Sequence, residues 1–63
     1  MLAVTYLTLH SGERGIKSLV MLVPGNTVLV KDGAHIRKER IERILWTNGN
    51  TWIASVMRGR LAA

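Results

Sequence analysis

Apolar and β-branched positions alternate along the start of the chain, from Leu2 to Leu9. Alternation with a period of two places successive side chains on opposite faces of a strand. Ser11-Gly12 and then Gly15 interrupt the pattern, because glycine weakens a strand and favours loops. We therefore predict a first strand over residues 2–9, followed by a glycine-containing loop.

A second apolar region is divided by the turn signal Pro24-Gly25-Asn26. Proline presets the φ angle of one turn residue, and glycine or asparagine tolerates a positive φ at the next. Residues 18–23 and 27–30 flank this signal and have the composition of strands, so they are predicted to form a hairpin. Asp32-Gly33 marks another turn directly after it.

The segment from Ala34 to Trp46 admits two interpretations. As a helix, it places four apolar residues on one face and two pairs of opposite charge four positions apart, but Ile36 and Trp46 fall outside that face. As sheet, it has a short strand at 35–36, a polar turn at 37–40 and a second strand from Ile41 into Thr47. Its residue types favour helix and its surroundings favour sheet.

The Asn-Gly dipeptide at 48–49 supports the sheet interpretation, because Asn-Gly between β-rich flanks is a strong hairpin signal. A turn centred on Gly49 places Trp46 opposite Trp52 and Ile44 opposite Ala54. Aromatic cross-strand pairs of this kind stabilise a sheet by about 0.2 to 1 kcal/mol each.

These patterns predict an all-β fold: a small, partly open barrel of about five strands that forms a single domain over residues 1–63. The alternative is an α+β domain in which a helix at 34–46 packs on an antiparallel sheet. Residues 58–63, Arg-Gly-Arg-Leu-Ala-Ala, are expected to be a frayed basic tail.

Residues 24–33, Pro-Gly-Asn-Thr-Val-Leu-Val-Lys-Asp-Gly, resemble the opening strand and turn of small SH3-like barrels, which include the Tudor and KOW modules. Residues 41–56 resemble the later hairpin of the same barrels. The chain lacks a recognisable aromatic cage of the Tudor kind, and its KOW glycine pattern is incomplete. The resemblance implies a binding module.

Cationic residues are concentrated in the second half of the chain, which has a net charge of +5 from nine Lys/Arg and four Asp/Glu. Guanidinium groups bind phosphate oxygens in a bidentate manner, so a cluster of them suits the nucleic-acid backbone. We therefore expect a non-enzymatic module that contacts DNA or RNA phosphates. The candidate residues are Arg37, Lys38, Arg40, Arg43, Arg58 and Arg60. The competing interpretation is a solvated face, since Glu39 and Glu42 lie among these cations.

Tyr6, Trp46 and Trp52 are candidates for stacking on unpaired bases, or for packing in the core or at an interface. The interface role belongs to a second functional class, a protein-interaction module or small inhibitor of phage or plasmid type. Such a module would use a β edge or a Trp patch and would meet an acidic protein partner.

The length of 63 residues predicts self-association. A domain of this size buries only roughly 60% of the surface that its extended chain exposes, so burial barely offsets chain entropy. A chain without cysteine can form neither disulfides nor thiolate metal sites. We therefore expect a homo-oligomer.

Other chemistries are not indicated by the sequence. His10 and His35 lie too far apart for zinc-site spacing, and no cofactor or catalytic motif is present, so we expect neither a metal, a cofactor nor enzymatic activity. Each long charge-free stretch is interrupted by a turn signal, and the N-terminal segment lacks a signal-peptide pattern. A cytoplasmic location without membrane insertion is the resulting expectation.

Overall fold

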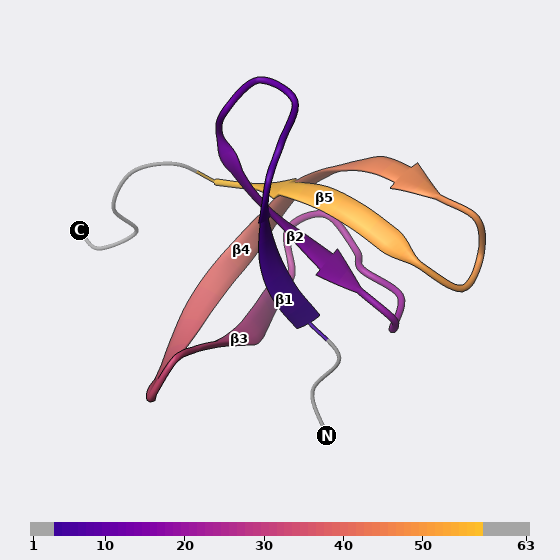
Figure 1. Cartoon of the computed structure of the whole chain (residues 1–63). Coiled ribbons are helices and arrows are strands. Elements are labelled where there is room, and N and C mark those ends of the chain that lie inside the picture. The colour runs from indigo at the N-terminus through magenta and orange to yellow at the C-terminus, as the bar shows by residue number, and fades with distance from the viewer. Residues whose placement is uncertain (1–3, 58–63) are drawn as a thin grey trace.

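The computed structural model describes residues 4–57 and folds them into five strands. The strands are β1 (Val4–Thr8), β2 (Arg14–Ser18), β3 (Thr27–Asp32), β4 (His35–Thr47) and β5 (Trp52–Val56). They pair antiparallel in the order β1-β2-β5-β4-β3, and the sheet curls into a half-barrel (Figure 1). The predicted all-β fold of five strands in a partly open barrel is confirmed. Among the described residues there is no helix of the length and apolarity that would cross a membrane.

The segment 34–46 lies in a strand, so the alternative helix is wrong, as is the polar turn expected at 37–40. The physical reason is that β4 has a partner strand along its whole length: its first half pairs with β3 and its second half with β5. A helix would leave the apolar residues of both partners uncovered. Gly33, with φ of 64°, makes the tight turn that returns the chain from β3 into β4.

The hairpin expected between residues 18–23 and 27–30 does not form. The hydroxyl of Ser18 donates to the carbonyl oxygen of Val20 at 2.8 Å and accepts from its amide at 2.9 Å. This local bonding turns the chain out of β2, and Leu22 then folds inward until it is only 2% exposed. The edges of β2 are already occupied by β1 and β5.

The turn at Pro24-Gly25 nevertheless forms, with the amide of Asn26 donating to the carbonyl of Val23 at 3.0 Å. It joins a loop to β3 rather than two paired strands. The amide of Gly25 donates to the carbonyl of Ile41 at 2.9 Å, which fastens the turn to β4. The local turn signal was therefore correct, and the partner assigned to β3 was wrong.

The β4–β5 hairpin forms as predicted, and Ile44 lies opposite Ala54. Trp46, however, lies opposite Ile53 and not opposite Trp52, because the register shifts between Ile44 and Trp46. Such a bulge inserts one extra residue and turns the following side chains to the other face.

The loop of this hairpin explains the change in register. The side-chain oxygen of Asn48 accepts from the amides of Asn50 and Thr51 at 2.9 and 2.8 Å. Thr47 also accepts from the amide of Gly49 at 2.9 Å. These bonds hold a connection over residues 48–51, between the paired Thr47 and Trp52, whereas the predicted register was centred on Gly49.

The core fills the concave side of the half-barrel. Its buried residues are Val4, Ile16, Leu22, Val30, Ile41, Ala54 and Val56. The edge strands β1 and β3 lie close together without pairing. Across this open side, the hydroxyl of Tyr6 donates to the carboxylate of Glu39 at 2.6 Å, which links β1 to β4.

Gly15 is the position where β2 has no room for a side chain. A Cβ placed there would lie 2.5 Å from Cδ2 of Leu9 and 2.9 Å from the carbonyl oxygen of Ala54. We predict that Gly15→Ala lowers the free energy of unfolding by about 1 to 3 kcal/mol through overpacking. Urea denaturation followed by circular dichroism measures this change. In a Leu9→Ala background the penalty becomes smaller, and an unchanged penalty there would contradict the role of Leu9.

Candidate nucleic-acid interface

The β3–β4 ribbon, residues 27–40, presents one cationic face to solvent. Residues directly opposite each other in an antiparallel pair share a face. Lys31 lies opposite Ile36, Leu29 opposite Lys38 and Thr27 opposite Arg40. The outer face of the ribbon therefore carries Lys31, Lys38 and Arg40 together with Thr27, Leu29 and Ile36, and all six are exposed.

Both acidic residues of the ribbon belong to the inner side. Glu39 lies opposite Val28, faces the core and is hydrogen-bonded to Tyr6. Asp32 accepts from Nε of Arg37 at 2.8 Å, and Arg37 lies opposite the fully buried Val30. Strand alternation thus separates a run of mixed charge into a cationic outer face and an inner face where the acids have partners.

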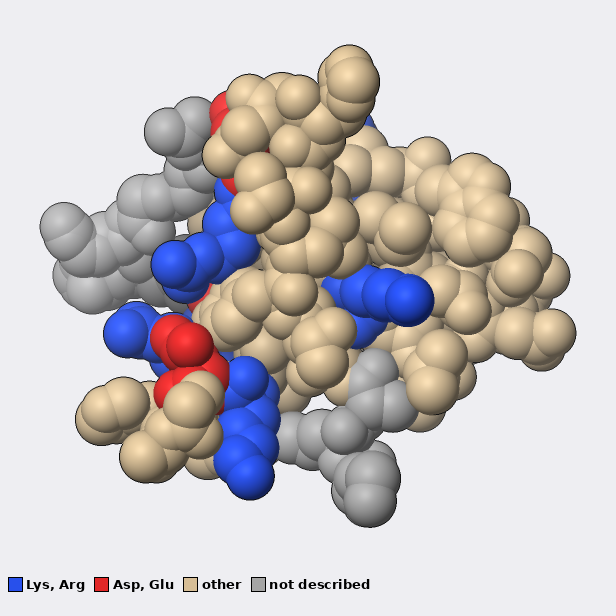
Figure 2. Space-filling model, viewed as in Figure 1, with Lys and Arg blue, Asp and Glu red and all other residues tan. Residues whose placement is uncertain are grey.

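The end of the ribbon extends beyond the core. Residues 33–38 are all exposed, including those whose side chains belong to the inner side. In Figure 1 the β3–β4 turn lies at the lower left, away from the other strands. Figure 2 shows several Lys and Arg side chains on this side of the molecule, with Asp or Glu side chains among them, whereas the right edge, around the β4–β5 turn, is uncharged. The ribbon is accessible to a large ligand.

The structure brings together only part of the predicted cationic set. Lys38 and Arg40 lie on the outer face of the ribbon, whereas Arg37 belongs to the inner side and is paired with Asp32. Arg43 lies further along β4, opposite Ser55. Arg58 and Arg60, with the tail at 58–63, lie outside the described residues.

Lys31 belongs to the same face but was not among the predicted residues. The signal that could have found it is the turn at Gly33, because a tight turn there places Lys31 opposite Ile36 and diagonal to Lys38. Among the described residues, none of Lys31, Lys38 and Arg40 has an ion-pair partner. The cationic face is therefore available to an external anion.

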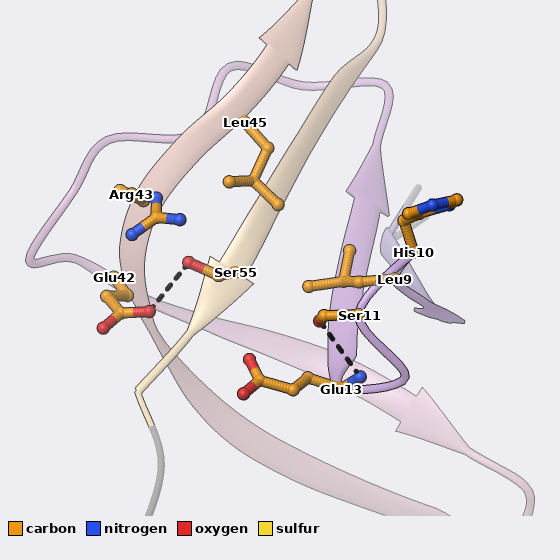
Figure 3. Close-up of a pocket in the computed structure, with 8 residues that line it drawn as sticks. All are labelled: Leu9, His10, Ser11, Glu13, Glu42, Arg43, Leu45 and Ser55. Carbon is orange, nitrogen blue, oxygen red and sulfur yellow. Dashed lines mark hydrogen bonds between the residues drawn. The ribbon is translucent and has the colours of Figure 1, made fainter.

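An open groove of about 510 Å³ separates the β1–β2 turn from β4 and β5 (Figure 3). It is lined by Leu9, His10, Ser11, Glu13, Glu42, Arg43, Leu45 and Ser55. The hydroxyl of Ser55 donates to Glu42 at 2.9 Å, and the ring of His10 points away from the groove. Arg43 shares these walls with the carboxylates of Glu13 and Glu42, so the groove is not a cationic surface.

The three aromatic residues occupy three different environments and form no common stacking platform. Tyr6 is half-buried below the guanidinium of Arg14, whose Cζ lies 4.6 Å from the ring centroid. Trp52 is half-buried and packs against the core. Trp46 lies on the opposite face of the sheet from Trp52 and is exposed. Of the three, Trp46 alone has the exposure that contact with another molecule needs.

No protein-family model matches the chain, and no curated protein or solved structure matches it either. Within residues 4–57 there is also no group of His, Asp and Glu side chains placed to hold a metal ion. The resemblance to SH3-like barrels stays a prediction. The ribbon and its charges are therefore the features of the molecule that indicate a function.

Burial and, to a smaller extent, the link to Glu39 change the ionisation of the Tyr6 phenol. Burial raises the pKa of Tyr6 from 10.0 to about 12, and the hydrogen bond to Glu39 and its negative charge act in the same direction. Arg14 acts in the opposite direction. Because the folded state favours the neutral phenol, this contribution to stability is fully present below about pH 10 and is lost as the pH rises through about 12.

Tyr6 is the only tyrosine, so its titration can be followed by phenolate absorbance. At about pH 10.5 we predict that Tyr6 is largely neutral in the folded chain and mostly ionised in the chain unfolded by urea. Glu39→Gln lowers the folded midpoint, because it removes the negative charge beside the phenol. A folded midpoint that Glu39→Gln leaves unchanged would contradict the link.

Proposed function

We propose that this chain is a non-enzymatic nucleic-acid-binding module whose β3–β4 ribbon contacts the phosphate backbone of duplex DNA. The observation that supports the proposal most directly is the separation of charge by β4. Lys38 and Arg40 share the outer face with Lys31, while Glu39 is held on the inner side by Tyr6. Three unpaired cations on one accessible face attract phosphate by displacing the counterions around it.

The dimensions of the ribbon favour duplex DNA over the other nucleic acids. Two paired strands lie about 4.8 Å apart, and the major groove of B-form DNA, about 12 Å wide, admits a two-stranded ribbon. The major groove of A-form RNA is too deep and narrow for side chains to read. Single strands are bound by aromatic platforms, and the aromatic residues of this chain are dispersed.

The apolar residues of the outer face also suit a DNA groove. Leu29 is 43% exposed and Ile36 is 57% exposed, and both lie between the cations. Phosphate contacts position a protein on the duplex, whereas contacts inside the groove depend on the bases. Ile36 lies beside the tip of the ribbon, where its methyl groups can contact the thymine methyl. The same mixture of residues weakens the interpretation of this segment as a purely solvated face.

The salt dependence of binding tests the three cations. Fluorescence anisotropy with a labelled DNA duplex measures the dissociation constant at several salt concentrations. For three phosphate contacts we predict a slope of log K against log salt of about −3, and Lys38→Ala/Arg40→Ala reduces it to about −1. The double variant also weakens binding at low salt by about tenfold or more.

A matched control is Lys17→Ala/Arg43→Ala, which removes one lysine and one arginine from outside the ribbon. Both double variants have the same net charge, but only the ribbon variant is expected to lose affinity and slope. Equal losses would indicate general attraction to a basic protein and would contradict the ribbon. Duplex RNA and single-stranded DNA serve as competitors and are expected to compete poorly. Failure of all three nucleic acids to bind at low salt would leave an acidic protein as the expected ligand.

A further inference from the structure

The two charge-free tracts of the sequence meet at one end of the folded molecule. One tract lies between Lys17 and Lys31, and the other between Arg43 and Arg58. The pairing of Ser18 with Trp52 brings the start of the first beside the middle of the second. The uncharged right edge of Figure 2 corresponds to the β4–β5 turn, and one Lys or Arg side chain lies between this edge and the centre of the view.

Large apolar side chains are exposed at this end, opposite the β3–β4 ribbon. We call them the apolar end: Leu19, Val20, Met21 and Trp46, which are 62%, 53%, 66% and 50% exposed. Ile53, half-buried, lies between Trp46 and Lys17 on the outer face of the sheet. Leu19, Val20, Met21 and Trp46 belong neither to the core nor to the ribbon. Packing within the fold therefore does not explain why they are apolar.

The composition of the apolar end is that of the centre of a protein interface. Such centres are depleted of charge and enriched in tryptophan and methionine, and the residues that contribute most to affinity are commonly aromatic. The three loop residues lie between two fixed points, because Ser18 bonds to Val20 at one side and Leu22 is buried in the core at the other. The loop that carries these exposed residues is therefore anchored at both of its ends.

A second copy of the chain is the partner that suits an apolar patch, because such a patch can face itself without opposing like charges. Each copy has a net charge of +5, so contacts through the ribbon would bring cations against cations. A stable interface covers about 800 Å² of each partner, which is about one sixth of the 4,605 Å² surface of this chain. At the apolar end, a second copy opposes fewer charges than it would at the ribbon, with Lys17 at the border of the contact. A two-fold dimer uses the same patch on both subunits, and an uncharged patch is complementary to itself.

We infer that the apolar end is the interface of a homodimer, formed by Leu19, Val20, Met21 and Trp46 of each copy around a two-fold axis. The dimer buries apolar surface that a core of seven small and medium residues cannot cover. It leaves both ribbons exposed. This inference is independent of the proposed function, because its residues do not overlap with those of the ribbon.

Sedimentation equilibrium of the full chain, over concentrations from about 10 to about 500 µM, tests the inference. We expect a monomer–dimer equilibrium for the natural chain. Val20→Lys is expected to raise the dissociation constant of the dimer by at least about tenfold, because it places like charges in a desolvated contact. Met21→Lys, at the most exposed of the four positions, is expected to have the same effect.

Ile36→Lys provides the matched control. Ile36 is 57% exposed, close to the 53% of Val20, and the substitution adds the same charge at the other end of the molecule. It is expected to leave the dimer unchanged, and far-ultraviolet circular dichroism confirms that all three variants are folded. A natural chain that is monomeric at the highest concentration would overturn the inference and leave the apolar end for a different protein. Dimers that persist in both Val20→Lys and Met21→Lys would also overturn it.

Discussion

The antiparallel pairing of β4 with two different strands organises the surfaces of this domain. β3 pairs along the first half of β4 and β5 along the second, so one strand of 13 residues crosses the whole molecule. Each residue of β4 is assigned to a face by its neighbour on the partner strand. Lys38 and Arg40 are directed outward by their pairing with β3. Trp46 is directed outward by a shift in its pairing with β5.

A bulge in β4 allows Ile41 and Ile44 to face the same core. Ile41 and Ile44 are three positions apart, which in a regular strand would place them on opposite faces. The register shift between Ile41 and Arg43 inserts one extra residue and returns Ile44 to the concave side. The same three-residue spacing favoured a helix in the sequence. The spacing of apolar residues in a bulged strand can therefore be the same as in a helix.

The strands β1 and β3 and the β4–β5 hairpin were predictable from local patterns, because period-two alternation and the residues of tight turns act over a few positions. β2 was not: it lies at Arg14–Ser18, where Gly15 indicated a loop, and not at 18–23. The partners of the strands were not predictable either. Ser18 ends β2 through a hydroxyl bond to Val20, which no hydrophobic pattern records. Leu22 leaves the predicted strand to fill the core. The pairing of β3 with β4 is predicted only if the turn signal at Gly33, and not the one at Pro24, is taken to join two paired strands.

The candidate site was predicted in composition and only partly in arrangement. The basic character of the second half was evident, but a sequence of mixed charges does not show which side each charge takes. That separation needs both the strand and its direction relative to the core. The pairing of Arg37 with Asp32, which removes one candidate, depends on a turn that places residues 32 and 35 opposite each other. The proximity of the end of β2 to the β4–β5 turn depends on the long-range pairing of β2 with β5.

The pairing of β2 with β5 also sets an order of events in folding. β3, β4 and β5 follow one another along the chain and can assemble through short-range contacts, as can the β1–β2 hairpin. Ile16 meets Ala54, however, only when the first hairpin joins the last strand across most of the chain length. Contacts between distant parts of a chain form late, because the entropy of closing a long loop must be overcome first. During synthesis, the β1–β2 hairpin leaves the ribosome before β5, so the core cannot close until β5 has also emerged.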